Sequence, residues 1–199
     1  MSNFASTIDK EQLQSLETAV FPGKIVLLDA EEITPELEEI FRAETLWGFD
    51  TESKPVFKKG AKNRIALIQM ATKDTCYLVR LSKQFPPVLT EIFNNPEVMK
   101  VGLSSKDDFL QLRSICKELK PQNVVELQSM VKSYGIEELS LQKIYAILFG
   151  QRISKTQRLS NWQAPELSEA QQQYAAMDAW SVREIYLKLQ GLTPQAVRE

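Results

Sequence analysis

The sequence contains no histidine among its 199 residues. This absence excludes Ser-His-Asp and Cys-His catalytic centres, zinc sites ligated by histidine, and any acid–base step that needs an imidazole. If the protein is a hydrolase, its chemistry must therefore depend on carboxylates, tyrosine and metal ions that prefer oxygen ligands.

Cysteine and long apolar runs are also scarce. The two cysteines, Cys76 and Cys116, have no metal-ligand spacing and lie among apolar neighbours, which predicts buried free thiols and a reducing compartment. No run approaches the roughly 20 apolar residues of a membrane span, and the start, MSNFASTIDKEQ, does not resemble a signal peptide. We therefore expect a cytoplasmic protein that does not associate with a membrane.

Positive charge is not in excess either. The net charge is -2 and the sequence pI is about 5.5, which argues against binding nucleic acid through overall positive charge. An anionic substrate would have to be held by local basic patches or by metal ions. A hydrophobic fraction of 43% and a charged fraction of 25% are ordinary for a soluble globular domain.

The hydrophobic pattern predicts an α/β domain that occupies residues 1–199, with a helix at its N-terminus. Apolar runs and helical periodicity favour a central mixed sheet of about five strands flanked by helices, in which residues 65–72 and 75–81 form a hairpin. The segments with strand character are 24–29, 46–53, 65–72, 75–81, 98–102 and 123–128. The segments with helical character are 7–20, 33–44, 86–95, 105–119, 130–135, 140–150 and 168–190.

Two acids stand inside an apolar strand. In LWGFDTES (46–53), Asp50 and Glu52 are separated by one residue, so a strand places both side chains on the same face. Two like charges at that distance repel each other, and a bound cation is a common reason for a fold to keep them. The alternative is a strand that ends near Asp50 in a solvated turn.

Further acids begin one helix and lie within another. Asp107 and Asp108 follow Gly102 in the first turn of a predicted helix, where the helix dipole also favours a carboxylate. In YAAMDAW, Tyr174 and Asp178 are four residues apart and share a helix face. The alanines around them are small, which would let this helix approach the sheet near Asp50.

One acid from each of the two helices, added to Asp50 and Glu52, makes four negative charges. These charges match two divalent cations, and a pair of such ions can activate a water and stabilise the leaving oxygen in phosphodiester hydrolysis.

The same segments carry a family resemblance. FDTE (49–52), VGLSSKDD (101–108) and YAAMD (174–178) resemble the three exonuclease motifs of the DEDDy class of 3'-5' exonucleases. That class includes ribonuclease D and the proofreading domain of DNA polymerase I. The likeness covers about residues 47–189 and is greatest to the subfamily of the Werner syndrome protein exonuclease domain, through GFDTESKP and RLSNW among other segments.

The resemblance implies a ribonuclease H-like fold and removal of nucleoside 5'-monophosphates from a 3' end. Asp50, Glu52 and Asp178 match metal-binding acids of the family, and Tyr174 matches its tyrosine. The family's spacing from Gly102 selects Asp108, with Asp107 as the alternative, since a helix turns them about 100° apart. The implied cofactors are two Mg²⁺ or Mn²⁺ ions held by the four acids.

Basic residues near the motifs suggest how a substrate is held. Lys58, Lys59, Arg64 and Arg158 are the candidates for binding a DNA or RNA strand that is single or has a recessed 3' end. Lys54, Lys62, Arg152 and Lys155 belong to the same two basic segments, and Phe57 and Trp162 could stack on bases. Surface loops carry lysines in any case, and Trp162 could instead fix its loop to the core.

Two other functions fit part of the pattern. A non-catalytic nucleic-acid-binding module could share the fold, but it would be expected to lose some of the acids. A metal-dependent hydrolase of small nucleotides would use the same acids, and degradation of a mononucleotide instead of an oligonucleotide would identify it.

Overall fold

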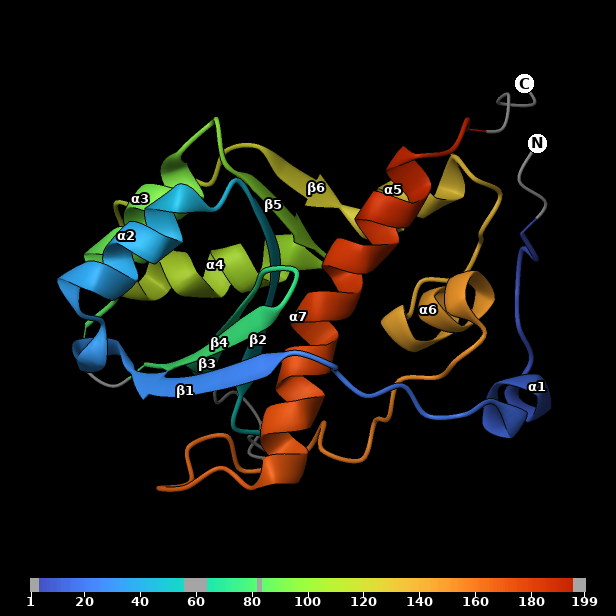
Figure 1. Ribbon diagram of the computed structural model, residues 1–199, viewed down its shortest axis with the longest axis horizontal. Coiled ribbons are helices and arrows are strands. Elements are labelled where there is room, and N and C mark those ends of the chain that lie inside the picture. The colour runs from blue at the N-terminus through green and yellow to red at the C-terminus, as the bar shows by residue number, and fades with distance from the viewer. Residues whose placement is uncertain (1–3, 56–63, 82–83, 195–199) are drawn as a thin grey trace.

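The computed structural model describes residues 4–55, 64–81 and 84–194 and has a six-stranded mixed sheet at its centre (Figure 1). The strand order is β1-β4-β3-β2-β5-β6. The strands are β1 (Lys24–Asp29), β2 (Leu46–Ser53), β3 (Ile65–Ala71), β4 (Thr75–Arg80), β5 (Met99–Gly102) and β6 (Val124–Glu126). The expected mixed sheet is confirmed, with six strands where about five were predicted.

Strand β2 lies near the middle of the sheet. It pairs antiparallel with β3 and parallel with β5, while β3 and β4 form the predicted antiparallel hairpin. Strands β1 and β6 extend the sheet in parallel pairs with β4 and β5. Parallel neighbours β2 and β5 therefore end at the same edge of the sheet, where ligand sites of open α/β sheets commonly lie.

Helices cover both faces of the sheet (Figure 1). One face carries α2, α3 and α4, and the other carries the long helix α7, with α5 and α6 packed beside it. The helices are α1 (Lys10–Ser15), α2 (Pro35–Ala43), α3 (Pro87–Asn94), α4 (Ser105–Ile115), α5 (Leu127–Lys132), α6 (Leu141–Phe149) and α7 (Glu169–Gln190), and a short 3₁₀ turn, η1, spans Ala30–Glu32.

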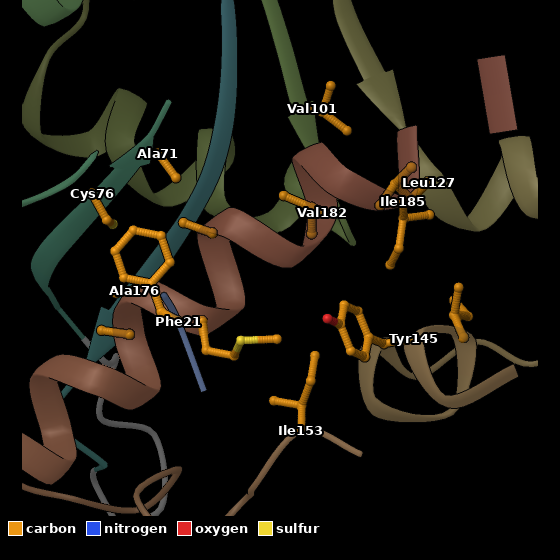
Figure 2. Packing of buried hydrophobic residues seen from close by; sticks show 14 of the residues in the cluster. Phe21, Ala71, Cys76, Val101, Leu127, Tyr145, Ile153, Ala176, Val182 and Ile185 are labelled. Carbon is orange, nitrogen blue, oxygen red and sulfur yellow. The ribbon is translucent and has the colours of Figure 1, made fainter. Parts of the chain in front are cut away.

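The side of α7 that packs on the sheet includes small and branched side chains. Ala175, Ala176 and Ala179 have no exposed surface and bring α7 close to the sheet, as predicted from their size. Figure 2 shows Val182 and Ile185 of α7 packed among residues of the sheet and of α5. Burial of this continuous apolar face is the main source of stability for α7.

The N-terminal helix is shorter than predicted. Helical spacing over residues 7–20 predicted a helix of that length, but α1 ends at Ser15. The chain then extends and pairs with the segment after α6: Ala19 N–H donates to the Arg152 carbonyl at 2.9 Å, and Arg152 N–H donates to the Glu17 carbonyl at 2.9 Å. Tertiary pairing thus overrides the local helical pattern in this segment.

A fully buried lysine anchors β5. The Lys100 ammonium donates to the backbone carbonyls of Ile92, Asn95 and Val98 at 3.1, 2.8 and 2.8 Å. The lysine therefore joins β5 to the C-terminal end of α3 and to the segment that connects the two elements.

Cysteines and long apolar segments, both scarce in the sequence, can be located in the fold. Cys76 and Cys116 are buried free thiols, as expected. Among the described helices, none is long and apolar enough to cross a membrane.

Candidate active site

The C-terminal half of β2 extends beyond the end of its neighbour β5. Only residues 46–48 of β2 pair with β5, whereas residues 48–53 continue beside β3. Strand β5 ends at Gly102 and the chain turns into α4. Within the part of the chain that the structure describes, the segment of β2 that holds Asp50 and Glu52 therefore has no strand partner on the side of β5, next to the start of α4.

Asp50, Glu52 and Asp178 face one another between β2 and α7. Gly48 contacts the backbone of α7, and because side chains alternate along a strand, Asp50 and Glu52 point to that same face. Burial, followed by the negative charges of neighbouring acids, raises the pKa of Asp50 well above its usual value and that of Glu52 to about 9. Burial also raises the pKa of Asp178 to about 7, against a hydrogen bond with Tyr174 that lowers it.

Asp108 joins this group through Thr51. The Thr51 hydroxyl donates a short hydrogen bond to Asp108 Oδ1, and the Thr51 N–H donates to Asp50 Oδ1 at 2.8 Å. Burial raises the pKa of Asp108 to about 6, although the hydrogen bond from Thr51 opposes this shift. Asp107 is exposed to solvent. Of the two adjacent acids, the structure thus brings Asp108 to the site.

Thr51 is a site residue that our sequence argument missed. It faces away from α7, and only the turn between β5 and α4 brings a partner to it. The one signal in the sequence was its position between Asp50 and Glu52, which does not indicate a contact 57 residues further along the chain.

Tyr174 lies beside the acids and is supported by an aromatic neighbour. Burial raises the pKa of the Tyr174 hydroxyl far above its usual value, and the nearby Asp178 and Glu52 carboxylates add to the shift. Tyr174 is consequently a neutral hydrogen-bonding group at physiological pH. The ring of Trp162 lies 6.0 Å from that of Tyr174, centroid to centroid. Trp162 is only 1% exposed, so it fixes its loop to the core and does not offer a face for stacking on bases.

A cleft of about 300 Å³ opens beside these residues. Asp50, Tyr174 and Asp178 line it together with Ser140 and Leu141 at the start of α6, and with Lys155 and Arg158 from the loop before α7. The positive charge of Arg158 lowers the pKa of Glu52, and that of Lys155 lowers the pKa of Asp178. The cleft thus combines a cationic wall with an acidic floor.

Two other predicted basic residues, Arg64 and Arg152, are not among the residues that line this cleft. Arg64 is exposed just before β3 and lines a separate hollow of about 200 Å³ with Arg80. Arg152 donates to the Leu16 carbonyl at 3.1 Å and so helps to hold the segment after α1. The candidates Lys58 and Lys59, like Phe57 and Lys62, lie outside the residues that the structure describes.

The acids form a suitable set of metal ligands, but they are not arranged as a coordination shell. Over residues 4–55, 64–81 and 84–194, no group of three or more Asp, Glu, His or Cys side chains could hold a metal ion as placed. Their chemistry nevertheless suits Mg²⁺ or Mn²⁺, because both prefer hard carboxylate oxygens. Burial is the main cause of the raised pKa values of all four acids. The negative charges of Asp108 and Asp178 raise the pKa values of Asp50 and Glu52 further, and a bound cation would offset both effects.

Comparison with known proteins supplies the family. The 3'-5' exonuclease family model matches residues 25–193. The mouse bifunctional 3'-5' exonuclease/ATP-dependent helicase WRN is 31% identical over 184 residues, which cover 86% of this chain and 13% of the mouse protein.

Solved structures share the fold. Escherichia coli RNase D, an exoribonuclease involved in structured RNA processing, superposes with a TM-score of 0.74 at 22% identity, covering 84% of this chain and 44% of that protein. Brucella melitensis NrnC bound to pGG superposes with a TM-score of 0.69 at 20% identity, covering 85% and 81%, and NrnC is also known with bound Mg²⁺.

The chain spans less than half the length of the mouse WRN protein and of Escherichia coli RNase D. The match to the family model, in contrast, runs through all six strands and from α2 to α7, and it includes every residue assigned to the site above. The predicted resemblance and the ribonuclease H-like fold are confirmed, and this chain belongs to the 3'-5' exonuclease family.

Proposed function

We propose that this chain is a metal-dependent 3'-5' exonuclease of the DEDDy class, which hydrolyses phosphodiester bonds of DNA or RNA and releases nucleoside 5'-monophosphates. The observation that carries the proposal is the convergence of acids from β2, α4 and α7 beside a cleft with a cationic wall. A non-catalytic binding module would have no use for four clustered acids whose charged forms are disfavoured by burial.

In this proposal, Asp50, Glu52, Asp108 and Asp178 hold two Mg²⁺ or Mn²⁺ ions. When bound, such ions lower the pKa of an attacking water and stabilise the charge that develops on the phosphate. The donor chemistry and the repulsion among the acids support this assignment. The protein's own part is to keep the four carboxylates close together and partly shielded from water.

The remaining groups of the cleft position the substrate. Lys155 and Arg158 would contact the phosphates of a single strand or of a recessed 3' end, and their position in the lining of the cleft supports this role. A cleft of about 300 Å³ is of the size that accommodates a small ligand such as a terminal nucleotide. The neutral hydroxyl of Tyr174 would orient the attacking water through a hydrogen bond.

We further propose that residues 1–199 act as one exonuclease domain in the cytoplasm. The buried free thiols of Cys76 and Cys116 are in keeping with a reducing compartment.

Metal dependence tests the function. We expect degradation of single-stranded DNA or RNA with Mg²⁺ or Mn²⁺, none in EDTA, and recovery when the ion is restored. Asp178→Asn should lower the rate by several orders of magnitude while circular dichroism shows an unchanged fold. The matched control is Glu39→Gln, which removes an exposed carboxylate on α2 and should keep full activity. Full activity of the parent in EDTA would contradict the proposal.

A further inference from the structure

Glu126, the last residue of β6, makes four hydrogen bonds that hold the start of α4 and of α5. Its Oε1 accepts from the backbone N–H groups of Ser104 at 2.8 Å and Gln128 at 3.3 Å. Its Oε2 accepts from the backbone N–H of Ser105 at 2.9 Å and from the Ser105 hydroxyl at 3.0 Å. A single carboxylate therefore satisfies three backbone donors that the helices themselves leave unpaired.

The turn that Glu126 holds is a strained one. Ser104 adopts the left-handed conformation, with φ 62° and ψ 24°, which is uncommon for a residue with a side chain. A Cβ built on Gly102 would lie 2.9 Å from Ser105 Cβ, so the turn is also tightly packed. Ser104 occupies the N-cap of α4 without making a side-chain cap bond, and Glu126 takes over the capping role from the neighbouring strand.

This turn determines where Asp108 lies. Asp108 follows Ser105 by three residues, so both lie on the same side of the first turn of α4. Ser105 is fixed by Glu126, and Asp108 receives the hydrogen bond from Thr51. A rotation of the first turn of α4 would move Asp108 away from Thr51 and from Asp50.

We infer that Glu126 is a positioning residue of the active site: by fixing the turn between β5 and α4, it holds Asp108 against Thr51. The inference rests on the proposed function for its effect on catalysis, because Asp108 is a metal ligand only in that proposal. Glu126 would fix Ser104, Ser105 and, through them, Asp108 whether or not the protein is an enzyme.

Activity measurements test the catalytic part. Glu126→Gln keeps the size of the side chain but replaces one carboxylate oxygen with an NH2 group, which cannot accept the hydrogen bonds that this oxygen accepts. We expect kcat to fall by about 10- to 100-fold, the usual effect of losing a residue that orients a ligand, with KM changed less than about threefold. Glu126→Asp should recover part of the loss, and Glu39→Gln should be neutral.

A double-mutant cycle separates positioning from general destabilisation. In an Asp108→Asn background, Glu126→Gln should cost less than about twofold in single-turnover rate, because the group that it positions is already lost. An equal loss in both backgrounds, or full kcat for Glu126→Gln alone, would overturn the inference.

Amide hydrogen exchange tests the geometric part without substrate or metal. Glu126→Gln should speed exchange at the amides of Ser104, Ser105 and the first turn of α4, while exchange in α7 stays unchanged. Unchanged exchange at residues 104–108 would contradict the inference. An inactive parent protein combined with faster exchange in the variant would refute the proposed function and support the geometric role of Glu126.

Discussion

The backbone of Gly48 in β2 lies directly against the backbone of Ala179 in α7. A Cβ built on Gly48 would be 2.0 Å from the Ala179 carbonyl oxygen, and that oxygen belongs to a helix that is buried along this face. Asp50 lies two residues beyond Gly48, and Asp178 immediately precedes Ala179. The close approach at Gly48 therefore brings two of the four acids together.

Gly48→Ala should damage both the fold and the site. The obstructing atom belongs to the backbone and cannot swing aside, so we expect a loss of more than about 3 kcal/mol in the free energy of unfolding, measured by urea titration. Any folded fraction should have lost most of its activity, because α7 must move away from β2.

Gly191→Ala is the matched control. Gly191 has φ -75°, and a Cβ there would lie no closer than 3.9 Å to a neighbouring atom. We expect its stability to stay within about 1 kcal/mol of the parent protein. Equal stability of both variants would show that α7 does not approach β2 as described.

Much of this arrangement could be predicted from the sequence, because it follows from local patterns. Alternation along 46–53 placed Asp50 and Glu52 on one face, and the small alanines of 175–179 predicted a close approach of the last helix. Both are properties of neighbouring residues, which a single sequence displays directly.

Other features depended on contacts between distant segments. The hydrogen bond from Thr51 to Asp108 and the capping of α4 by Glu126 join residues that are far apart in sequence. The early end of α1 has the same cause, since the chain after Ser15 pairs with Arg152. Long-range pairing of this kind leaves no periodic signal.

The metal-free protein should lose stability as the pH rises. The pKa values of Asp108, Asp178 and Glu52 are raised in the folded protein to about 6, 7 and 9, from 3.8, 3.8 and 4.5 for the unperturbed groups. Between the unperturbed pKa of each group and its raised pKa, the folded state thus binds more protons than the unfolded state. The stability of the folded state decreases as these protons are lost with rising pH. In EDTA, Tm should fall between about pH 5.5 and pH 9.

Two further measurements check why Tm falls with pH. Asp178→Asn should make Tm less dependent on pH and raise Tm at alkaline pH, because one negative charge is removed from the cluster. Mn²⁺ should raise Tm more at pH 8 than at pH 5.5. A metal-free Tm that rises steadily up to pH 9 would contradict the raised pKa values of these acids.

The adjacent acids Asp107 and Asp108 should differ sharply. Asp108→Asn removes the carboxylate that accepts a hydrogen bond from the Thr51 hydroxyl, and we expect steady-state activity to be lost. Asp107→Asn changes an exposed side chain. It removes a favourable charge near a helix start, worth about 0.3–1 kcal/mol of stability, and a negative charge that raises the pKa of Asp108. The opposite order of activities would assign the ligand to Asp107.

Tyr174→Phe tests the hydroxyl separately from the ring. The substitution keeps the packing against Trp162 but removes the group that would orient the water. We expect kcat to fall by about 10- to 1,000-fold, with substrate affinity nearly unchanged. Tyr186→Phe, about three turns further along α7, is the control and should remain active. Parental activity in Tyr174→Phe would make Tyr174 a packing residue.

The direction of degradation tests the central claim most directly. A single strand labelled at its 5' end should give, with Mg²⁺ or Mn²⁺, a ladder of labelled products that shorten step by step from the 3' end. The same strand labelled at its 3' end should release the label at once as a mononucleotide. Immediate release of a short fragment carrying the 5' label would show an endonuclease or an enzyme of the opposite polarity, and would contradict the assignment of this site to a 3'-5' exonuclease.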